Sequence, residues 1–343
     1  MAKDASGGAP TLEMVARRAG VSRATVSRVV NGSPKVSPEV VSAVNAAVAE
    51  LRYVPNRAAR SLARRSSSAI ALIVPEDVTV FFGDPYFASV VQGIMDRIDD
   101  SEYVLNLLVA SADPQRKTRG YLESGVVDGA IVISHHAGDE LFEHATVPLV
   151  YGGRPSAGID AYVVDVDNVE AAVSGTEHLI AIGRRRIGTI SGPLDMPAGI
   201  DRLEGFRRAV GAAGLPDDLV ETGDFTAEGA AAATRRLLDR VGDGRDGRPL
   251  GVDALFVASD LMATGALAVL AERGLRVPED IAIVGFDDSP AALRTGVPLT
   301  TVAQPSAEQG RLMAELLIRL IEGDETVPKQ TILPTRLVLR ESA

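Results

Sequence analysis

The sequence predicts an α/β protein with a small helical head and a larger body of parallel β-sheets. Two observations support this prediction. Residues 11–54 carry apolar side chains at helical spacing, interrupted by residues that begin and end helices. After residue 68, short apolar runs alternate with amphipathic helical stretches, a pattern typical of parallel strands with helices on both faces. Because roughly 275 residues is large for one such sheet, we expect the body to form two lobes.

The composition excludes several classes of protein. The 343 residues are 46% hydrophobic and 24% charged, with no cysteine and four histidines. Disulfides, thiolate nucleophiles and cysteine zinc sites are therefore excluded. The sequence lacks HExxH, Walker and strand-linked GxGxxG motifs, so we expect no metal, no cofactor and no catalytic residues. It also lacks an apolar run of signal-peptide or membrane-spanning length, so we expect a cytoplasmic protein that does not contact a membrane.

The charge is divided unevenly along the chain. Residues 1–66 contain 11 basic and 4 acidic residues, a net charge of +7 in a chain whose net charge is -11. The remainder therefore carries a net charge of -18. A basic head on an acidic body is typical of a protein whose N-terminal part binds a polyanion, although a solvated basic face explains the charge equally well.

Three short helices are predicted in the head. The first is capped by Thr11 and ends at Gly20. The second is capped by Ser22 and spans Arg23–Val30, and the third spans 37–51, beginning with Ser-Pro-Glu. Two short helices joined by a tight turn and followed by a third have the dimensions of a helix-turn-helix.

In a helix-turn-helix, the start of the second helix lies in the major groove of DNA. Here that segment runs from Arg23 to Arg28. Arginine can bridge the O6 and N7 acceptors of guanine, while the methyl group of Ala24 suits thymine. The hydroxyls of Thr25 and Ser27 suit phosphate oxygens. The head therefore predicts sequence-specific binding to double-stranded DNA.

A second DNA-contacting segment is predicted after the third helix. Pro55 ends that helix, and residues 56–65 are good helix formers over a length that is unstable alone in water. Leu62, the large apolar side chain of this segment, is flanked by four arginines. Such a leucine can insert between base steps in the minor groove while arginines hold phosphates, although a lone exposed leucine is also ordinary.

The residues from Thr11 to Arg65 closely resemble the DNA-binding head of the LacI/GalR family of bacterial transcription regulators. The match includes the motifs VSRATVSRVVN and YVPNRAARSL. The resemblance implies a flexible leader over 1–10, a helix-turn-helix domain over 11–54, a hinge helix and linker over 55–67, and an effector-binding and dimerisation domain over 68–343. The DNA-contacting residues that it implies are Thr11, Leu12, Ser22, Arg23, Ala24, Thr25, Ser27, Arg28, Asn31, Lys35, Tyr53, Asn56, Ala59 and Leu62. Among them, the pair Arg23-Ala24 is expected to set operator preference.

The body contains eight strand candidates with helical stretches between them. A helix is expected around Phe87–Ile98, another around Ser306–Glu322, and a last β-like run precedes Arg340. The strand candidates are Ala69–Val74, Val104–Val109, Gly129–Ile133, Pro148–Tyr151, Tyr162–Val166, Arg186–Ser191, Ala254–Ala258 and Ile281–Phe286.

The body also resembles the LacI/GalR effector domain, which shares its two-lobed fold with periplasmic sugar-binding proteins. The matching stretches include DPYFASVVQGI, EHLIAIGRRRIGTISGP and FVASDLMATGALAVLAERGLRVPEDIAIVGFDD. Arginine and aspartate suit polyhydroxylated ligands, because they donate and accept paired hydrogen bonds. The resemblance places these residues in an effector cleft between the lobes: Asp84, Tyr86, Phe87, Ser134, Arg202, Phe225, Ser259, Asp287 and Gln304.

Structural roles compete with ligand binding at several positions. Arg202 could lie on an exposed helix face, and Asp287 could cap the turn that begins at Asp288-Ser289. A structural role is also open for Phe81, Phe82, Phe87, His135, His136, Asp260 and Met262.

Together these features predict a homodimeric transcriptional repressor that binds a pseudo-palindromic operator and, when bound, associates with the nucleoid. One head reaches only a short half-site, so a two-fold dimer is the natural arrangement. The resemblance implies a small-molecule effector, a sugar or sugar derivative, with a nucleoside or purine and an activator role as the alternatives. A sugar-processing enzyme lacks a catalytic spacing here, and a secreted sugar receptor lacks a signal peptide.

Overall fold

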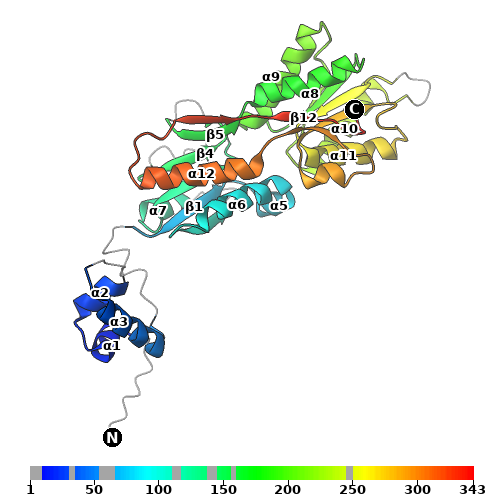
Figure 1. Cartoon of the computed structure of the whole chain (residues 1–343). Helices are drawn as coiled ribbons and strands as arrows, with labels where there is room; N and C mark the ends of the chain where they lie inside the picture. The colour runs from blue at the N-terminus through cyan, green and yellow to red at the C-terminus, as the bar shows by residue number, and fades with distance from the viewer. Residues whose placement is uncertain are drawn as a thin grey trace. The chain divides into compact units, whose positions relative to one another are not determined.

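The computed structural model describes residues 10–30, 35–53, 66–109, 117–136, 145–155, 160–244 and 250–343. The chain divides into two compact units, Met1–Ser67 and Ser68–Ala343, which are described separately below as the head and the body (Figure 1). Within the described ranges, no helix is long and apolar enough to cross a membrane.

The described head contains the helices that the sequence predicts. They are α1 (Leu12–Ala19), α2 (Arg23–Val30) and α3 (Pro38–Leu51). The Thr11 side chain accepts a hydrogen bond from the Met14 amide and caps α1, and Gly20 ends that helix with a φ of 70°. The apolar faces of the helices meet in a core made of Val15, Ala16, Val26, Val44, Ala47 and Tyr53.

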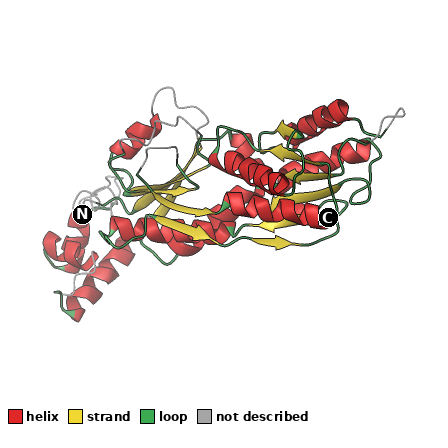
Figure 2. Cartoon of the chain, turned by 90° about the horizontal axis from the view of Figure 1, so that it is seen from above, coloured by secondary structure: helices red, strands yellow, loops and turns green. Residues whose placement is uncertain are grey.

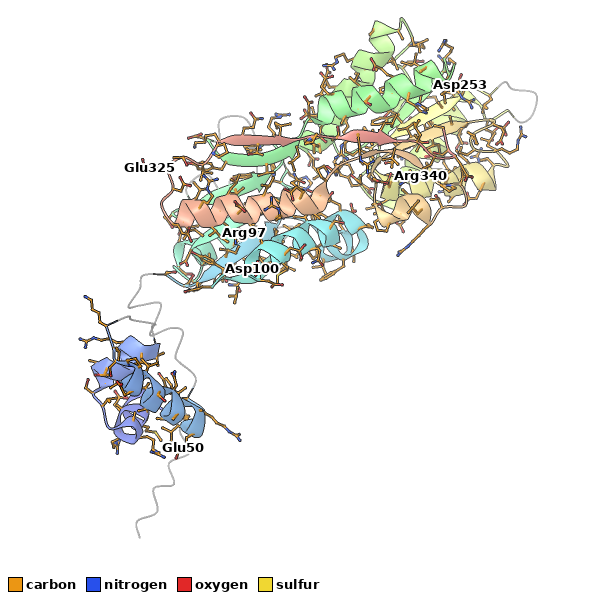
Figure 3. The ribbon with its side chains drawn as sticks, in the orientation of Figure 1. Glu50, Arg97, Asp100, Asp253, Glu325 and Arg340 are labelled. Atoms are coloured by element: carbon orange, nitrogen blue, oxygen red, sulfur yellow. The ribbon has the colours of Figure 1, made fainter. Side chains whose placement is uncertain are left out.

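One lobe of the body, the N-lobe, contains a sheet of strand order β11-β5-β4-β3-β1-β2, with parallel pairing throughout. Helices α6 and α12 pack on one face and α7 packs on the other. Arg97 of α6, labelled in Figure 3, pairs with Glu315 of α12 at 3.3 Å. The elements are β1 (Ala69–Val74), α5 (Val78–Gly83), α6 (Pro85–Ile98), β2 (Val104–Val109), α7 (Lys117–Glu123), β3 (Gly129–Ile133), β4 (Leu149–Gly152), β5 (Tyr162–Val166), α12 (Ser306–Ile321) and β11 (Gln330–Leu333).

The other lobe, the C-lobe, contains a sheet of order β12-β10-β9-β8-β6-β7, in which β12 alone among the described strands is antiparallel to its neighbour. Helices α10 and α11 cover one face and α8 and α9 the other, so strands lie between helical layers (Figure 2). The elements are α8 (Asn168–Ala181), β6 (Ile187–Ser191), α9 (Pro197–Ala212), β7 (Val220–Thr222), α10 (Ala227–Val241), β8 (Ala254–Val257), α11 (Asp260–Glu272), β9 (Ala282–Asp287), η2 (Pro290–Leu293), β10 (Thr300–Ala303) and β12 (Arg336–Val338).

The described chain passes between the lobes at three places. It crosses after β5, after β10 and after β11. Each lobe is therefore assembled from separate segments of sequence, and the residues at the crossings lie where the lobes meet. The two-lobed α/β prediction is confirmed.

All eight predicted strands are present, with ends that match the prediction or differ from it by one residue. Strands β7 and β10 were not predicted, and the last β-like run was not expected to divide into β11 and β12. Strand β7 has only three residues, which are half-buried or exposed at a sheet edge, and β10 begins with two threonines. Neither strand contains the continuous apolar run that predicted the other strands.

Helices α8 and α9 of the C-lobe approach each other closely at Gly205. A Cβ atom at this position would lie 2.3 Å from the carbonyl oxygen of Val169 and 2.7 Å from the Cβ of Ala172. Real contacts of this kind are longer, so the two helices pack at this distance because residue 205 has no side chain.

Candidate functional site

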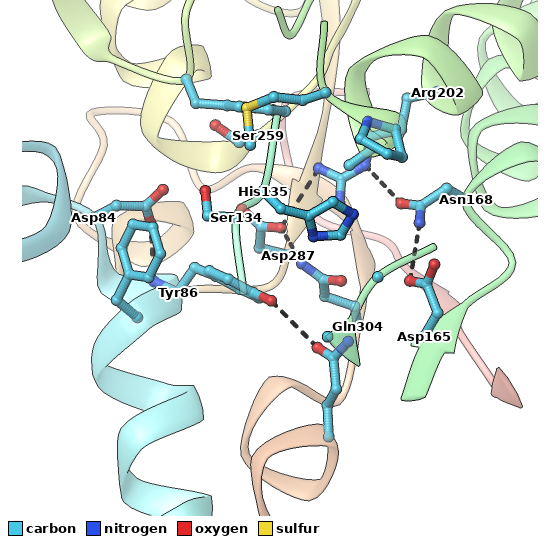
Figure 4. Close-up of a pocket in the computed structure, with 18 of the residues that line it drawn as sticks. Asp84, Tyr86, Ser134, His135, Asp165, Asn168, Arg202, Ser259, Asp287 and Gln304 are labelled. Carbon is cyan, nitrogen blue, oxygen red and sulfur yellow. Dashed lines mark hydrogen bonds and ion pairs between the residues drawn. The ribbon is translucent and has the colours of Figure 1, made fainter. Parts of the chain in front are cut away.

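A pocket that is open to solvent lies between the lobes of the body (Figure 4). It lies at the carboxyl ends of the strands, where ligands bind in open α/β sheets. Its lining includes all nine residues predicted for the effector cleft: Asp84, Tyr86, Phe87, Ser134, Arg202, Phe225, Ser259, Asp287 and Gln304. The structure brings these residues together, and their role in ligand binding stays a prediction.

Arg202 lines the C-lobe side of the pocket, and the residue is only 6% exposed. Its Nε donates to Asn168 Oδ1 at 2.9 Å and its Nη1 to the Ala258 carbonyl oxygen at 2.6 Å. It also lies 3.6 Å above the centre of the Phe286 ring. Arg202 is therefore a buried, oriented cation rather than the exposed helix residue that was the alternative.

Asp287 lies beside Arg202, with 3.8 Å between Oδ1 and Nη1. Its Oδ1 also accepts a hydrogen bond of 2.6 Å from Gln304 Nε2. Burial raises the pKa of Asp287 well above its ordinary value, and Arg202 opposes this shift. The alternative role for Asp287, a cap of the following turn, belongs instead to Ser289, whose hydroxyl accepts from the Ala291 amide.

Asp287, Ser134 and Phe225 share a further property: each has a positive φ, of 110°, 57° and 61° respectively. Residues with side chains rarely adopt this conformation, and such strain concentrates at functional sites. All three line the pocket.

The N-lobe wall is formed around the start of α6. Asp84 caps this helix by accepting from the Tyr86 amide at 2.9 Å. The Tyr86 hydroxyl lies 3.4 Å from Gln309 Oε1 of α12. Burial raises the pKa of Asp84 to about 6 and also raises the pKa of the Tyr86 hydroxyl. The burial of this wall therefore disfavours the charged form of the Asp84 carboxyl group.

The first crossing between the lobes contributes Asp165 and Asn168 to the pocket. Asp165 accepts hydrogen bonds from the Arg154 and Val166 amides and from Asn168 Nδ2. Burial raises the pKa of Asp165 to about 6. Because Asn168 also binds Arg202, the crossing connects the N-lobe sheet to the arginine in the C-lobe.

Ion pairs join the lobes at the mouth of the pocket. His136 of the N-lobe bonds Asp195 of the C-lobe through Nδ1 at 2.9 Å and Glu76 through Nε2 at 3.3 Å. The Glu76 hydrogen bond is the main cause that raises the pKa of His136 to about 9. Arg154 of the N-lobe pairs with Asp201 of α9 at 2.7 Å. These contacts hold the two lobes together in this structure.

The other residues for which a structural role was open lie in different environments. His135 is buried, lines the pocket and bonds the Arg154 carbonyl oxygen through Nε2 at 2.7 Å. Phe81 and Met262 are buried in hydrophobic clusters, whereas Phe82 is exposed. Asp260 is not the cap of α11: Ser259 is, and Asp260 instead accepts from the Ser289 amide and the Thr301 hydroxyl.

Several lining residues were missed by the sequence analysis: Asp165, Asn168, Met196 and Gln309. Glu76 and Arg154, which follow the ends of β1 and β4, were likewise not among the predicted cleft residues. Asp165 lies near the end of β5 and Asn168 begins α8, where ordinary turn and capping residues also occur, so the sequence carried no signal that a lobe crossing occurs there. Gln309 lies inside α12, and a polar residue on a buried helix face is the signal that could have revealed it.

The described head presents most of its predicted DNA-contacting residues on its surface. Arg23, Ala24 and Arg28 are exposed along α2. The hydroxyl of Ser22 accepts from the Thr25 amide and caps the helix, and the two hydroxyls lie 2.9 Å apart. Thr11 and Lys35 are also exposed, whereas Leu12 and Ser27 are half-buried.

Tyr53 is the most buried of the predicted DNA-contacting residues that the structure describes. It is 8% exposed and packs in the core of the head, so its ring stabilises the helices, and a DNA contact by this residue stays a prediction. Four other predicted DNA contacts lie outside the described residues: Asn31, Asn56, Ala59 and Leu62.

Comparison with known proteins gives matches over both units. Residues 11–56 match the family described as bacterial regulatory proteins, lacI family, and residues 176–343 match the periplasmic binding protein-like domain. The HTH-type transcriptional regulator CelR of Thermobifida fusca is 46% identical over 341 residues, covering 97% of this chain and 98% of CelR. The ribose operon repressor of Escherichia coli K12 is 33% identical over 341 residues, covering 97% and 99% of the two chains.

Solved structures resemble this chain over its length. A complex of the transcriptional regulator CelR with cellobiose has a TM-score of 0.76 and 44% identity, covering 97% of this chain and 100% of that one. The lac repressor dimer bound to operator and the anti-inducer ONPF has a TM-score of 0.85 and 28% identity, covering 98% and 99%.

Proposed function

The chain belongs to the LacI family of bacterial regulatory proteins, and on this basis we propose that it is a dimeric transcriptional repressor controlled by a neutral sugar. The head binds the operator, and the pocket between the lobes binds the sugar without converting it. The observation that carries the proposal is the buried pair of Arg202 and Asp287, which line the pocket together. Together they offer charged donors and acceptors to adjacent hydroxyl groups.

The charge of the pocket favours an uncharged ligand over a phosphorylated one. Among the described lining residues, four carboxyl groups face two guanidinium groups: Glu76, Asp84, Asp165 and Asp287 against Arg154 and Arg202. Both guanidinium groups already bond protein oxygens. A phosphate group would therefore meet repulsion without a free cation to offset it.

We propose cellobiose, or a closely related glucoside, as the effector. CelR, with which this chain shares nearly half of its residues, was solved with cellobiose. Apolar surface from Phe225 and Met196 accompanies the polar groups of the pocket, and sugars need both kinds of contact.

A dimer face is proposed on the side of the body formed by α5, α11 and η2. Phe82 is 74% exposed there, and Val78 and Leu293 are exposed as well. A groove with a largely apolar lining runs beside them, between α11, η2 and the start of α6. Large exposed apolar side chains next to a groove mark a protein-protein interface. A second copy that uses the same face gives the two-fold arrangement that a pseudo-palindromic operator requires.

Control follows from linkage between the two ligands. If cellobiose binds one arrangement of the lobes more tightly and the operator favours the other, each lowers the affinity for the other by the same factor. The direction proposed here is release of the operator by the sugar.

The test is calorimetry of the full-length protein with cellobiose, cellobiose carrying a 6-phosphate, and adenosine. Arg202→Met is compared with Arg208→Met, which removes an arginine from the exposed face of the same helix. We expect cellobiose alone to bind, Arg202→Met to abolish binding and Arg208→Met to retain it. Cellobiose should be recovered intact, and it should release DNA fragments selected from the genome. Equal binding by the two variants, or preference for the phosphate, would contradict the proposed site.

A further inference from the structure

An acidic side chain lies on the part of the head that is predicted to read DNA. Glu13 of α1 contacts Arg23 at the start of α2, with 3.1 Å between Oε1 and Nε. Both side chains are exposed, Arg23 at 73% and Glu13 at 51%. A carboxylate is unfavourable on a surface that approaches phosphates, so its position calls for a physical explanation.

The contact orients the arginine. A guanidinium carries five N–H donors in a rigid plane, and a carboxylate on Nε still allows its terminal nitrogens to donate to O6 and N7 of guanine. A free arginine side chain loses about 2 kcal/mol of rotamer entropy when it is fixed. Holding Arg23 in one orientation before binding removes part of that cost.

The ion pair contributes little in water and more in a DNA groove. Exposed pairs typically stabilise a protein by about 0–1 kcal/mol. Between the head and the bases, water is displaced and the effective dielectric falls, so the attraction between the two groups increases. The pair therefore has its largest effect in the complex in which Arg23 contacts a base.

We propose that Glu13 is a positioning residue for base recognition: it holds Arg23 in the orientation that reads guanine and lowers the attraction of the head for DNA of any sequence. The negative charge of Glu13 lowers the affinity of the head for phosphates in DNA of any sequence, and its contact with Arg23 increases the discrimination between guanine and other bases. This inference rests on the proposed function of the head as the operator-binding unit.

A purely structural role makes a different prediction. Glu13 lies in the first turn of α1, where an acidic residue interacts favourably with the helix dipole. Loss of that interaction alone would lower the thermal stability of the head and weaken binding to all sequences alike. Only a positioning role changes the preference at one base pair.

The head supplies a matched control. Arg18 of α1 and Glu50 of α3 form another exposed ion pair, at 2.6 Å. Glu50 lies near the end of α3, as Figure 3 shows, and neither partner is among the predicted DNA contacts. Glu50→Gln therefore removes the same charge from the same unit without touching Arg23.

The experiment is selection from a random duplex library by the full-length protein, with sequencing of the bound DNA. Wild type, Arg23→Ala, Glu13→Gln and Glu50→Gln are compared. We expect wild type to select two half-sites and Arg23→Ala to lose guanine preference at one position of each. Glu13→Gln should reduce the preference at that same position about fivefold, corresponding to about 1 kcal/mol. Its affinity for unselected DNA should rise about twofold to fivefold, while Glu50→Gln keeps the wild-type preference.

Two results would overturn the inference while leaving operator binding intact: an unchanged preference in Glu13→Gln, or a loss spread equally over all positions. If wild type itself selects no sequence, the proposed function of the head fails, and the inference fails with it.

Discussion

Replacement of Gly205 by alanine should weaken both the C-lobe and the pocket, because α8 and α9 touch at this residue. The added Cβ would lie 2.3 Å from the Val169 carbonyl oxygen, so one helix must move by about 1 Å to reach an ordinary contact distance. Overpacking of this kind costs about 1–3 kcal/mol. Alanine itself favours the helix by about 1 kcal/mol over glycine, which offsets part of the loss.

The same displacement reaches the ligand site. Arg202 lies three residues before Gly205, and Asn168 directly precedes Val169. The bond between Arg202 Nε and Asn168 Oδ1 is 2.9 Å long, and an increase of about 1 Å breaks it. Without Asn168 as a partner, the Arg202 guanidinium is no longer held in the orientation that faces the pocket, so the affinity for cellobiose, the proposed effector, should fall about tenfold.

Gly211→Ala is the control within the same helix. A Cβ at Gly211 meets no heavy atom within 4 Å, so alanine there should stabilise the helix by about 0.4–1 kcal/mol. Thermal unfolding of the full-length protein should show a midpoint about 4 °C lower for Gly205→Ala and about 2 °C higher for Gly211→Ala. Equal midpoints and equal cellobiose affinities for the two variants would refute the reasoning.

Two further predictions concern the ion pairs at the pocket mouth and the proposed dimer face. The pKa of His136 is raised to about 9 in the folded protein, so its stabilising contribution is fully present below its unfolded value of about 6.5 and is lost as the pH rises through 9. Between pH 6.5 and 9.5, the midpoint of thermal unfolding of wild type should therefore fall relative to that of His136→Ala. The fall should be only a few °C, because the side chain is partly exposed. A difference that stays constant with pH would count against the pairing with Glu76 and Asp195. Phe82→Glu places a charge on the proposed dimer face and should give monomers in sedimentation experiments, with operator affinity reduced at least about tenfold. The control is Ile182→Glu, at an exposed residue at the end of α8, which should leave the dimer intact. If the Phe82→Glu variant still forms dimers, this face is excluded as the dimer interface.

The sequence revealed those elements whose burial leaves a clear pattern. Strands such as β1 and β3 are buried along their whole length and read as continuous apolar runs. The head helices carry capping residues and stops at their ends, so the bounds of α1 and α2 were predicted to the residue and those of α3 to within one residue. Strand β7 is three residues long at a sheet edge, and its short half-buried sequence could not be distinguished from a loop.

The pocket was predictable only in part, and for a physical reason. Arg202, Phe206 and Ala209 share one buried face of α9, so an arginine among apolar neighbours was visible in the sequence. Asp165 and Asn168 reach the pocket because the chain crosses between lobes there, and such a crossing depends on which sheet each strand joins. Strand pairing over long sequence separations leaves no local pattern.

Both lobes contain strands from the C-terminal part of the chain, and this affects the order in which the parts of the protein can fold during synthesis. The N-lobe needs β11 beside β5 and α12 on its face, and the C-lobe needs β12 beside β10. Neither lobe can be completed until the ribosome has delivered nearly the whole polypeptide, whereas the head has its own core near the start. During synthesis the head can therefore fold before the effector pocket exists. The pairing of two heads that a pseudo-palindromic operator requires must still wait for the body, because the proposed dimer face lies there.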